Sequence, residues 1–516
     1  MSNFVFADNK ITFSKVLDTQ LMKVLSEITS DEGFYQSEFK VAPEYLFQYL
    51  KELQNRAESG DYCLFELVMF LNEQFKDSIE ATQNMIQDNK ISFNALQNYF
   101  QVGNKIITKD NFNKLSGGII TDVSMQTNQQ GMRYYQIQYS QVSTNGKGAI
   151  LINKYAYLNY FRGMVNINSL DTRKPTDEEL EILTERGKKF KSFIKGNHYK
   201  FYNGNMFKMT YFGPMLFNAT GRCIVDPQGF KKMNPNQSHD KMSNMHSLPD
   251  EQLFMCSPFI RGFSLVAKTW GEMFVESIEE IKFDENAYDL LVLNQSIKKM
   301  VKALIVNSNN SFTDIISCKS GGVCMLLQGA PGSGKTLLAE SSSELLKKPL
   351  YSVAVGELGT DVSHLETQLN KILELAASWK AVVLIDEADI FMAKRTEHNI
   401  IHNAIVSVFL RLLERYDGVM FLTTNRNSDI DEAFKSRISI SIPFEKPNIN
   451  TRNEIWTNLL HASKTELSKE DIVYLSEKYD INGRQIKNAI RMAQALAKDE
   501  EQCLNKTHLD IALGFI

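Results

Sequence analysis

The pattern of apolar and polar positions is most regular between residues 323 and 442. Short apolar runs alternate there with longer stretches in which apolar residues recur at helical spacing. This alternation is typical of parallel strands that are buried on both faces and joined by crossover helices. We expect strands at 323–328, 350–355, 382–385, 419–424 and 439–442, with helices at about 362–378 and 399–415. The pattern predicts an α/β fold with a five-stranded parallel sheet and right-handed crossovers.

The segments on either side follow other periods. Residues 1–103 are mostly helical in pattern, whereas residues 104–230 contain alternating runs joined by turn residues, so we predict an α+β N-terminal region. Residues 231–280 begin with an aperiodic stretch and are interpreted as a linker and lead-in. Only helical periods remain in residues 447–516, which predicts a small helical domain after the core at residues 281–446.

Composition and charge narrow the class of protein. The net charge of −4 gives no general attraction to nucleic acid or to an anionic membrane. The six cysteines form no CxxC pair, which is typical of reduced thiols in a reducing compartment. No apolar run reaches the roughly 18 residues that a membrane span needs, and no signal peptide is evident. We therefore expect a cytoplasmic or nuclear protein without a membrane span.

The first predicted strand of the sheet runs into a glycine-rich loop. Residues 329–336 have the pattern GxxxxGKT, and helical spacing follows. The backbone N–H groups of such a loop surround the phosphates of a nucleotide at a helix N-terminus. We expect Lys335 to meet the β- and γ-phosphates and the Thr336 hydroxyl to hold Mg²⁺. The loop residues predicted to bind ATP are Gly329, Ala330, Pro331, Gly332, Ser333, Gly334, Lys335, Thr336 and Leu337.

Two carboxylates follow the strand predicted at 382–385. Asp386 and Glu387 lie at the edge where open α/β sheets bind ligands. We expect Asp386 to hold Mg²⁺ through water and to contribute to the nucleotide site, and Glu387 to deprotonate the attacking water. The alternative is an acidic surface turn, and the following Asp389 is interpreted as a solvated or capping acid.

Together these motifs resemble the AAA ATPases of the AAA+ superfamily over about residues 281–516. Residues 329–336 are similar to Walker A and residues 384–387 to Walker B, while residues 421–426 are similar to the strand that ends in the sensor 1 residue, here Asn425. The resemblance implies a P-loop NTPase fold with a C-terminal helical lid, and an ATP hydrolase that uses Mg²⁺. It also implies that Asn425 positions the attacking water, although a cap at the strand end is the alternative.

Two arginines are assigned through the same resemblance. Residues 431–437 are similar to an arginine-finger segment, so Arg437 is expected to act on the γ-phosphate of a neighbour in a homo-oligomer. Only one arginine follows where two are common, and the Ser-Arg form is closer to clamp loaders. Arg484 is placed like a sensor 2 arginine that reaches from the lid to the nucleotide. The alternatives are a surface arginine paired with an acid and a solvated lid arginine.

Two further features concern substrates. Many AAA rings thread polypeptide past an aromatic residue, but the loop at 356–361 has none, and Leu358 is a weak substitute. The stretch from Lys188 to Tyr202 interleaves lysines with aromatic residues, which indicates either a nucleic-acid surface or a helix with a cationic face and an aromatic core face. The second interpretation is favoured. The N-terminal half also resembles a eukaryotic AAA group whose upstream domain has no assigned role, through residues 91–96, 186–190 and 224–227.

The sequence thus predicts a ring-forming ATPase that remodels a protein or nucleoprotein substrate selected by the N-terminal half. Its catalytic residues would be Lys335, Glu387, Asn425 and Arg437. One alternative is an assembly switch or scaffold driven by ATP binding. Another is a nucleic-acid-handling ATPase of the clamp-loader type, although the net charge gives it no support. The substrate and the ring size do not follow from the sequence.

Overall fold

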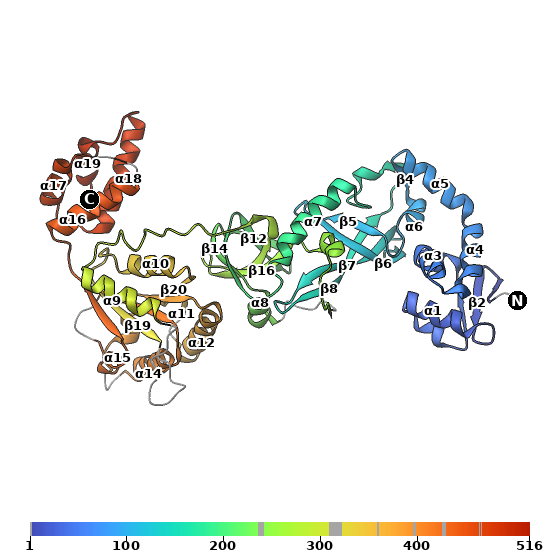
Figure 1. Cartoon of the computed structure of the whole chain (residues 1–516), viewed down its shortest axis with the longest axis horizontal. Helices are drawn as coiled ribbons and strands as arrows, with labels where there is room; N and C mark the ends of the chain where they lie inside the picture. The colour runs from blue at the N-terminus through green and yellow to red at the C-terminus, as the bar shows by residue number, and fades with distance from the viewer. Residues whose placement is uncertain are drawn as a thin grey trace. The chain divides into compact units, whose positions relative to one another are not determined.

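The computed structural model describes residues 3–235, 242–308, 322–358, 361–395, 399–425, 430–463, 465 and 467–516. The chain divides into two compact units, Met1–Glu279 and Glu280–Ile516 (Figure 1). Arg426 of the sensor 1 segment and the residues Gly359 and Thr360 of the loop at 356–361 lie outside the described residues. No helix in the described ranges is long and apolar enough to cross a membrane.

The first unit begins with a three-stranded antiparallel sheet packed against helices. A core that includes Ile11, Phe13 and Leu25 holds this part together. Its sheet was not expected in a segment predicted as helical. The strands are β1 (Val5–Ala7), β2 (Lys10–Ser14) and β3 (Glu38–Val41), and the helices are α1 (Thr19–Thr29), α2 (Pro43–Phe47), α3 (Leu50–Glu58), α4 (Phe65–Gln74), α5 (Lys76–Gln87) and α6 (Leu96–Tyr99).

Two larger antiparallel sheets complete the first unit. The six-stranded sheet has the order β10-β5-β6-β7-β8-β15, and the seven-stranded sheet has the order β13-β12-β17-β16-β14-β11-β18. The strands of the first are β5 (Lys105–Lys109), β6 (Leu115–Thr127), β7 (Arg133–Thr144), β8 (Ala149–Asn159), β10 (Thr172–Arg173) and β15 (Met242–Asn244). Those of the second are β11 (His198–Tyr202), β12 (Asn205–Thr210), β13 (Gly213–Asn218), β14 (Gly221–Val225), β16 (Phe259–Ser264), β17 (Thr269–Phe274) and β18 (Ile278–Glu279). A small pair, β4 (Lys90–Ser92) and β9 (Met164–Asn166), stands apart.

The described residues 242–280 are not a linker, and this part of the sequence interpretation is corrected. They contribute β15 to one sheet and β16, β17 and β18 to the other. Between them, a 3₁₀ helix (Asp250–Met255) buries three consecutive apolar side chains under α7 (Asp177–Lys191). A Cβ on Gly187 of α7 would lie 2.1 Å from the carbonyl oxygen of Leu253, so the two elements pack backbone to backbone. β16 and β17 pair with each other, whereas β15 and the 3₁₀ helix pack against elements that lie far away in the sequence.

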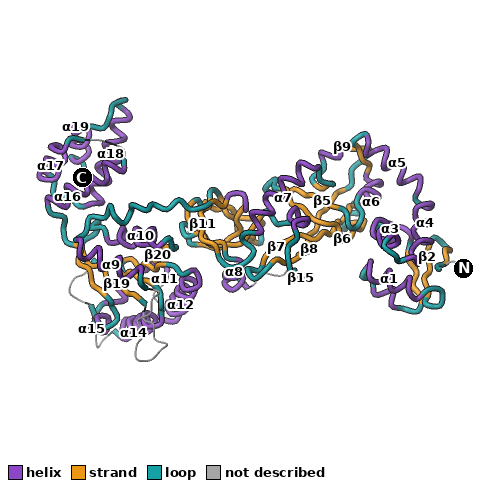
Figure 2. The backbone as a smooth tube through the Cα atoms, in the orientation of Figure 1, coloured by secondary structure: helices purple, strands orange, loops and turns teal. Residues whose placement is uncertain are grey.

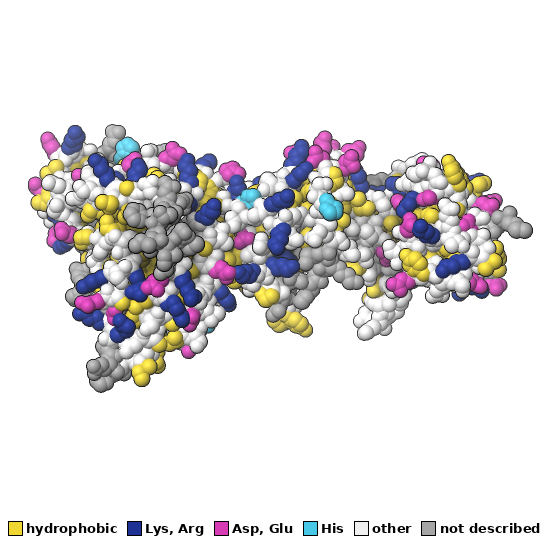
Figure 3. Space-filling model, turned by 60° about the horizontal axis from the view of Figure 1, so that its bottom comes forward, with side chains coloured by type: hydrophobic (Ala, Val, Ile, Leu, Met, Phe, Trp, Pro, Cys, Tyr) yellow, Lys and Arg dark blue, Asp and Glu magenta, His cyan; other side chains and the backbone are white. Residues whose placement is uncertain are grey.

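The basic and aromatic stretch after residue 186 belongs to the core of the first unit. Phe190 and Phe193 are buried, whereas Lys188 pairs with Glu185 and Lys191 pairs with Asp250 at the surface. The helix thus has a cationic face and an aromatic core face, as the favoured interpretation holds. On the face of the molecule shown in Figure 3, basic and acidic side chains are intermixed.

The second unit contains the predicted five-stranded parallel sheet, which confirms the α/β fold of the core. Its order is β20-β21-β22-β19-β23, and every pairing is parallel. Helices cover both faces, with α9 and α10 on one and α12 and α14 on the other (Figures 1 and 2). The strands are β19 (Val323–Gly329), β20 (Leu350–Ala354), β21 (Val382–Asp386), β22 (Val419–Thr424) and β23 (Ile440–Phe444). The helices are α9 (Gln295–Val306), α10 (Lys335–Leu346), α11 (Val355–Leu358), α12 (Val362–Trp379), α13 (Asp389–Met392), α14 (Ile400–Arg415) and α15 (Glu432–Lys435).

A four-helix domain follows the sheet, as the helical period after residue 447 predicts. It packs around Trp456, Leu475 and Ile486, which are fully buried. Each of its helices begins at an asparagine or serine whose side chain accepts a hydrogen bond from a backbone N–H of the first turn. The helices are α16 (Ile449–Ala462), α17 (Lys469–Lys478), α18 (Gly483–Asp499) and α19 (Lys506–Leu513).

Candidate active site

The glycine-rich loop joins the end of β19 to the start of α10. Gly329 and Gly332 have φ angles of 151° and 77°, in the range that favours glycine. A Cβ on Gly329 would lie 2.2 Å from the carbonyl oxygen of Phe444 in β23, and one on Gly332 would lie 2.8 Å from Oδ1 of Asn482. The loop therefore needs glycine at both positions because other parts of the same unit approach its backbone closely.

The ammonium group of Lys335 lies at the centre of the loop. Its Nζ donates to the carbonyl oxygens of Gly329 at 2.6 Å and Ala330 at 2.9 Å, and to Oδ1 of Asn425 at 2.9 Å. Burial lowers the pKa of Lys335, and the carboxylates of Asp386 and Asp389 oppose this effect. The structure thus brings the predicted phosphate-binding lysine and the predicted sensor 1 residue into direct contact.

The loop offers hydrogen-bond donors that lack a partner in the described part of the chain. The Oγ of Ser333 is buried and has no such partner. No side chain among the described residues caps the N-terminus of α10, which starts with Lys335, Thr336 and Leu337. A helix N-terminus leaves backbone N–H groups unpaired, and its dipole favours anions. The residues present therefore fit a phosphate group.

The acidic segment after β21 is attached to the neighbouring strand β22. Thr423 donates its hydroxyl hydrogen to Oδ1 of Asp386, and its Oγ1 accepts from the backbone N–H of Glu387 at 2.9 Å. Glu387 has a φ of 55° and is exposed, so its carboxylate faces solvent at the edge of the sheet. The next threonine, Thr424, donates to Asp389, which is therefore a bonded acid rather than a solvated one.

Sequence reasoning missed both threonines. The only signal for them was their position in the strand before Asn425.

The oxygen ligands available for Mg²⁺ are few. Within the described ranges, no three or more His, Cys, Asp or Glu side chains are grouped so as to hold a metal ion. Mg²⁺ is commonly held by one or two carboxylates together with the phosphates of a substrate. Asp386, half-buried at the end of β21, and Thr336, half-buried in the first turn of α10, fit that type of site.

The helical domain reaches the loop through the start of α18. Asn482 donates from Nδ2 to the carbonyl oxygen of Pro331 at 3.3 Å, while its Oδ1 accepts from the backbone N–H of Gln485 at 3.0 Å. Arg484, two residues later, is exposed, and its positive charge contributes to lowering the pKa of Lys335. The structure thus places Arg484 near the lysine, and the close contact of Asn482 was not predicted.

Arg437 follows α15 and turns toward its own chain. Its Nη2 lies 2.5 Å from Oε1 of Glu414, and its Nη1 donates to the carbonyl oxygen of Ala433 at 2.6 Å. In the ranges that the structure describes, no hydrogen bond or ion pair connects Arg437 with Lys335, Asp386 or Glu387. The trans role of Arg437 stays a prediction.

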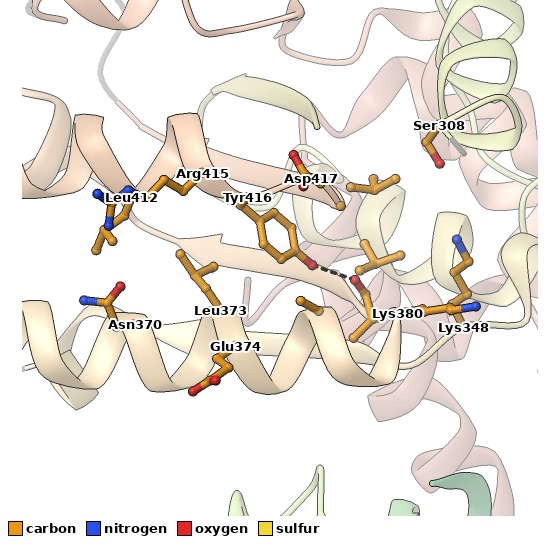
Figure 4. Close-up of a pocket in the computed structure, with 15 residues that line it drawn as sticks. Ser308, Lys348, Asn370, Leu373, Glu374, Lys380, Leu412, Arg415, Tyr416 and Asp417 are labelled. Atoms are coloured by element: carbon orange, nitrogen blue, oxygen red, sulfur yellow. Dashed lines mark hydrogen bonds between the residues drawn. The ribbon is translucent and has the colours of Figure 1, made fainter. Parts of the chain in front are cut away.

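A pocket of about 590 Å³ lies at the opposite end of the strands (Figure 4). Val382 and Val419, the first residues of β21 and β22, form part of its wall, and Tyr416 donates to the carbonyl oxygen of Ala381 there. Asp386 and Asn425 come at or after the other ends of these two strands. The pocket is therefore separate from the glycine-rich loop and its acidic partners.

Comparison with known proteins assigns these features to a family. Residues 325–446 match the model of the ATPase family associated with various cellular activities (AAA), and residues 81–173 match a domain of unknown function, DUF7025. The first match contains the loop, Asp386, Glu387, Asn425 and Arg437. The second lies within the first unit and carries no assigned activity.

Several curated relatives are similar to about a third of this chain. A 26S proteasome regulatory subunit homolog of Methanothermobacter thermautotrophicus is 27% identical over 202 residues, which are 37% of this chain and 54% of that protein. The 26S proteasome regulatory subunit 4 homolog of Schizosaccharomyces pombe is 32% identical, over 34% of this chain and 43% of its own. Fidgetin-like protein 1 of Drosophila melanogaster is 27% identical, over 32% of this chain and 33% of its own. The matched stretch spans about half or less of each relative.

A solved structure described as the FIGL-1 AAA domain in complex with ADP is 18% identical, covers 46% of this chain and 86% of that chain, and has a TM-score of 0.37. The family match and the relatives confirm the resemblance drawn from the motifs. The loop and its carboxylates therefore lie in the segment that matches the model of the AAA family of ATPases.

Proposed function

We propose that the chain hydrolyses ATP at this site and works as an oligomer that remodels a protein substrate in the cytoplasm or the nucleus. The observation that carries the proposal is that the glycine-rich loop and the acidic segment are both bonded to residues at the end of β22. Asn425 contacts Lys335, and Thr423 contacts Asp386 and Glu387. A phosphate-binding lysine, a metal-binding carboxylate and a general base are thus assembled at one edge of the sheet.

Each residue has a defined task in the proposed reaction. Lys335 and the N–H groups at the start of α10 bind the β- and γ-phosphates of ATP. Thr336 and Asp386 would hold Mg²⁺, which neutralises phosphate charge when bound. Glu387 accepts a proton from the attacking water, and Asn425 orients that water. Transfer of a phosphoryl group requires mainly positioning and charge stabilisation, and these residues supply both.

The present contacts of Lys335 support its role in binding. Its ammonium now donates to two carbonyl oxygens of the loop itself. A buried lysine whose pKa burial lowers gains most from an anionic partner. ATP phosphates would replace these neutral acceptors with charged ones, so binding is expected to depend strongly on this side chain.

An oligomer is proposed because Arg437 makes no contact with Lys335, Asp386 or Glu387 among the residues that the structure describes. An arginine finger contributes roughly 10³ to 10⁵ in rate in other phosphate-hydrolysing enzymes. The same residue is paired with Glu414 at the surface, from which a neighbour could engage it. Assembly would then be part of catalysis, with both protomers needed for one turnover.

A protein substrate is proposed from the relatives, among which are 26S proteasome regulatory subunits. Nucleic acid is less well supported, since three aromatic residues of the basic stretch, Phe190, Phe193 and Tyr202, are buried in the first unit. The contact with a polypeptide substrate would also differ from that of many AAA rings, because the loop at 356–361 has no aromatic residue. Leu358, the apolar residue of the loop at 356–361, is fully buried and is not available as a substitute.

The experiment that tests hydrolysis replaces the proposed base. Glu387→Gln should retain ATP binding, measured with a fluorescent ATP analogue, and lower kcat by a factor of about 10² or more. Glu470→Gln, at an exposed position in the first turn of α17, serves as the matched control and should keep the parental rate. Turnover by Glu387→Gln at the parental rate would show that another group is the base.

The same variant tests the substrate and the assembly. Slowed hydrolysis in ATP should keep the oligomer and its substrate together, so a pull-down followed by imaging would identify the substrate and count the protomers. A chain that stays monomeric at every concentration with nucleotide bound, yet hydrolyses ATP rapidly, would contradict the oligomeric part of the proposal.

A further inference from the structure

We propose that Thr423 is a positioning residue of this site, whose hydroxyl sets the geometry of both the metal-binding carboxylate and the general base. The inference rests on the proposed function, because it assigns a role within the same reaction. It concerns a side chain that contacts neither phosphate nor water itself and acts through Asp386 and Glu387.

Three consecutive residues of the acidic segment are attached to Thr423. Its hydroxyl donates to Asp386 Oδ1, its Oγ1 accepts from the N–H of Glu387 at 2.9 Å, and its carbonyl oxygen accepts from the N–H of Ala388 at 2.9 Å. A hydroxyl has one hydrogen to donate and two lone pairs, so it makes both bonds at once. The side chain is 1% exposed, and water therefore does not compete for either bond.

The bond to Asp386 fixes the orientation of a carboxylate. With Oδ1 accepting from Thr423, the carboxylate plane is set and Oδ2 remains for a metal or its water. Metal-binding carboxylates are generally oriented in this way, and loss of such a partner typically costs 10- to 100-fold in metal affinity or activity. Thr423 is expected to act on Asp386 in the same manner.

The bond to Glu387 holds a backbone conformation that is rare for a glutamate. Its φ of 55° lies in the left-handed region, which residues with a Cβ seldom adopt. Such strain persists where the surrounding structure holds it, and it is common at functional sites. The N–H of Glu387 is anchored on Thr423, so the direction in which the base leaves the strand depends on that hydroxyl.

The neighbouring threonine provides a matched comparison. Thr424 lies on the same strand, is also 1% exposed and donates to a carboxylate, that of Asp389. Asp389 is not assigned to the metal or to the base. Replacement of either threonine by valine removes one buried hydroxyl next to a carboxylate, and Thr423→Val removes the hydroxyl that is bonded to Asp386 and Glu387.

The test uses the full chain with the variants Thr423→Val, Thr423→Ser and Thr424→Val. The Kd of a fluorescent ADP analogue is measured in EDTA and in Mg²⁺, together with kcat, the Mg²⁺ concentration for half-maximal activity and the thermal midpoint. Thr423→Val should bind within about twofold of the parent in EDTA, lose most of the gain from Mg²⁺, need about 10-fold more Mg²⁺ and lose about 10- to 100-fold in kcat. Thr423→Ser should restore these values.

Thr424→Val distinguishes a positioning role of Thr423 from a general loss of protein stability. It should lower the thermal midpoint about as much as Thr423→Val and keep the gain in affinity from Mg²⁺. The inference would be overturned if Thr423→Val kept the parental Mg²⁺ dependence and kcat, or if Thr423→Ser failed as completely as valine does. A parent that binds no nucleotide would instead overturn the proposed function, and this inference with it.

Discussion

The guanidinium group of Arg437 forms an ion pair with Glu414 of its own chain, with 2.5 Å between Nη2 and Oε1. The contact joins Arg437, the second residue after α15, to the last turn of α14. Its Nε is buried and has no hydrogen-bond partner in the described ranges. The contacts with Glu414 and Ala433 engage only part of the five N–H groups of Arg437, so a trans contact would use the remaining groups or replace the ion pair.

Arg437→Ala is expected to lower kcat about 10³-fold or more while nucleotide binding remains, because the finger stabilises transition-state charge and not the ground state. Lys335→Ala should fail in nucleotide binding. Rings mixed from the two variants should regain part of the activity, since an intact loop then meets an intact arginine. Steady-state hydrolysis across mixing ratios measures this rescue.

Arg411→Ala is the matched control for this experiment, because Arg411 lies on α14 and, like Arg437, forms an ion pair with a glutamate, here Glu366. It should leave kcat unchanged. Parental kcat in Arg437→Ala would rule out the finger, whereas an inactive Arg437→Ala without rescue at any mixing ratio would argue against a site shared between protomers.

Gly332→Ala is expected to weaken nucleotide binding about 10-fold. The φ of 77° strains any residue with a Cβ by about 1–2 kcal/mol, and the new Cβ would lie 2.8 Å from Oδ1 of Asn482. The loop would relieve both by leaving its present conformation. Gly356→Ala is the control, because nothing lies within 4 Å of its added Cβ and its φ is not positive. Equal affinities in the two variants would contradict the prediction.

Asn482→Ala is expected to change both stability and nucleotide affinity. Loss of the N-cap of α18 should cost about 1 kcal/mol, and loss of the bond to Pro331 should shift the nucleotide Kd by about 2- to 10-fold. Asn505→Ala removes the equivalent cap from α19, which has no contact with the loop among the described residues. Calorimetry should show equal losses of stability in the two variants. Nucleotide titration should show a shifted Kd in Asn482→Ala but not in Asn505→Ala.

Glu179→Gln is expected to destabilise the first unit at neutral pH by about 1–3 kcal/mol. Arg173 donates to the Glu179 carboxylate at 2.6 Å and 2.8 Å, which holds the pKa of Glu179 below its usual value. A depressed pKa stabilises the fold above the unfolded value of 4.5, and this contribution is lost as the pH falls through the folded value. Glutamine keeps an oxygen that can accept from Thr176 in the capping box, and it removes the charge together with one of the two acceptors of Arg173.

Urea unfolding of the full chain at a series of pH values measures this effect. The difference between parent and Glu179→Gln should be full at pH 7 and shrink steadily below pH 4.5. Glu185→Gln, which removes an exposed partner of Lys188, should differ little from the parent at any pH. A difference that persists unchanged at low pH would show that packing, and not the charge, is responsible.

The sequence predicted the core of the second unit well because its signals are local. The strand from Val323 to Gly329 is buried on both faces, so its apolar run is uninterrupted, and the loop pattern follows directly. The segment 231–280 was misinterpreted for the opposite reason. β15 pairs with β8 some 90 positions earlier in the chain, and β16 pairs with β14, so neither pairing leaves a local signal; the hairpin of β16 and β17 is local and was missed.

The roles of side chains were harder to predict where they depend on register. Thr423 fits a strand as well as valine does, and its contact with Asp386 exists only because β21 and β22 pair in parallel with Ile385 opposite Leu422. Likewise, Glu414 and Arg437 are separated by a whole strand and helix α15, so their ion pair required the folded structure.

The position of β22 between β19 and β21 has a mechanical consequence. Its end is tethered to the ammonium group on one side and to the acidic segment on the other. A slide of this strand along its axis would disturb both tethers in the same instant. A protomer whose β22 is displaced would therefore lose phosphate binding and water activation together. It would not retain one of these functions without the other.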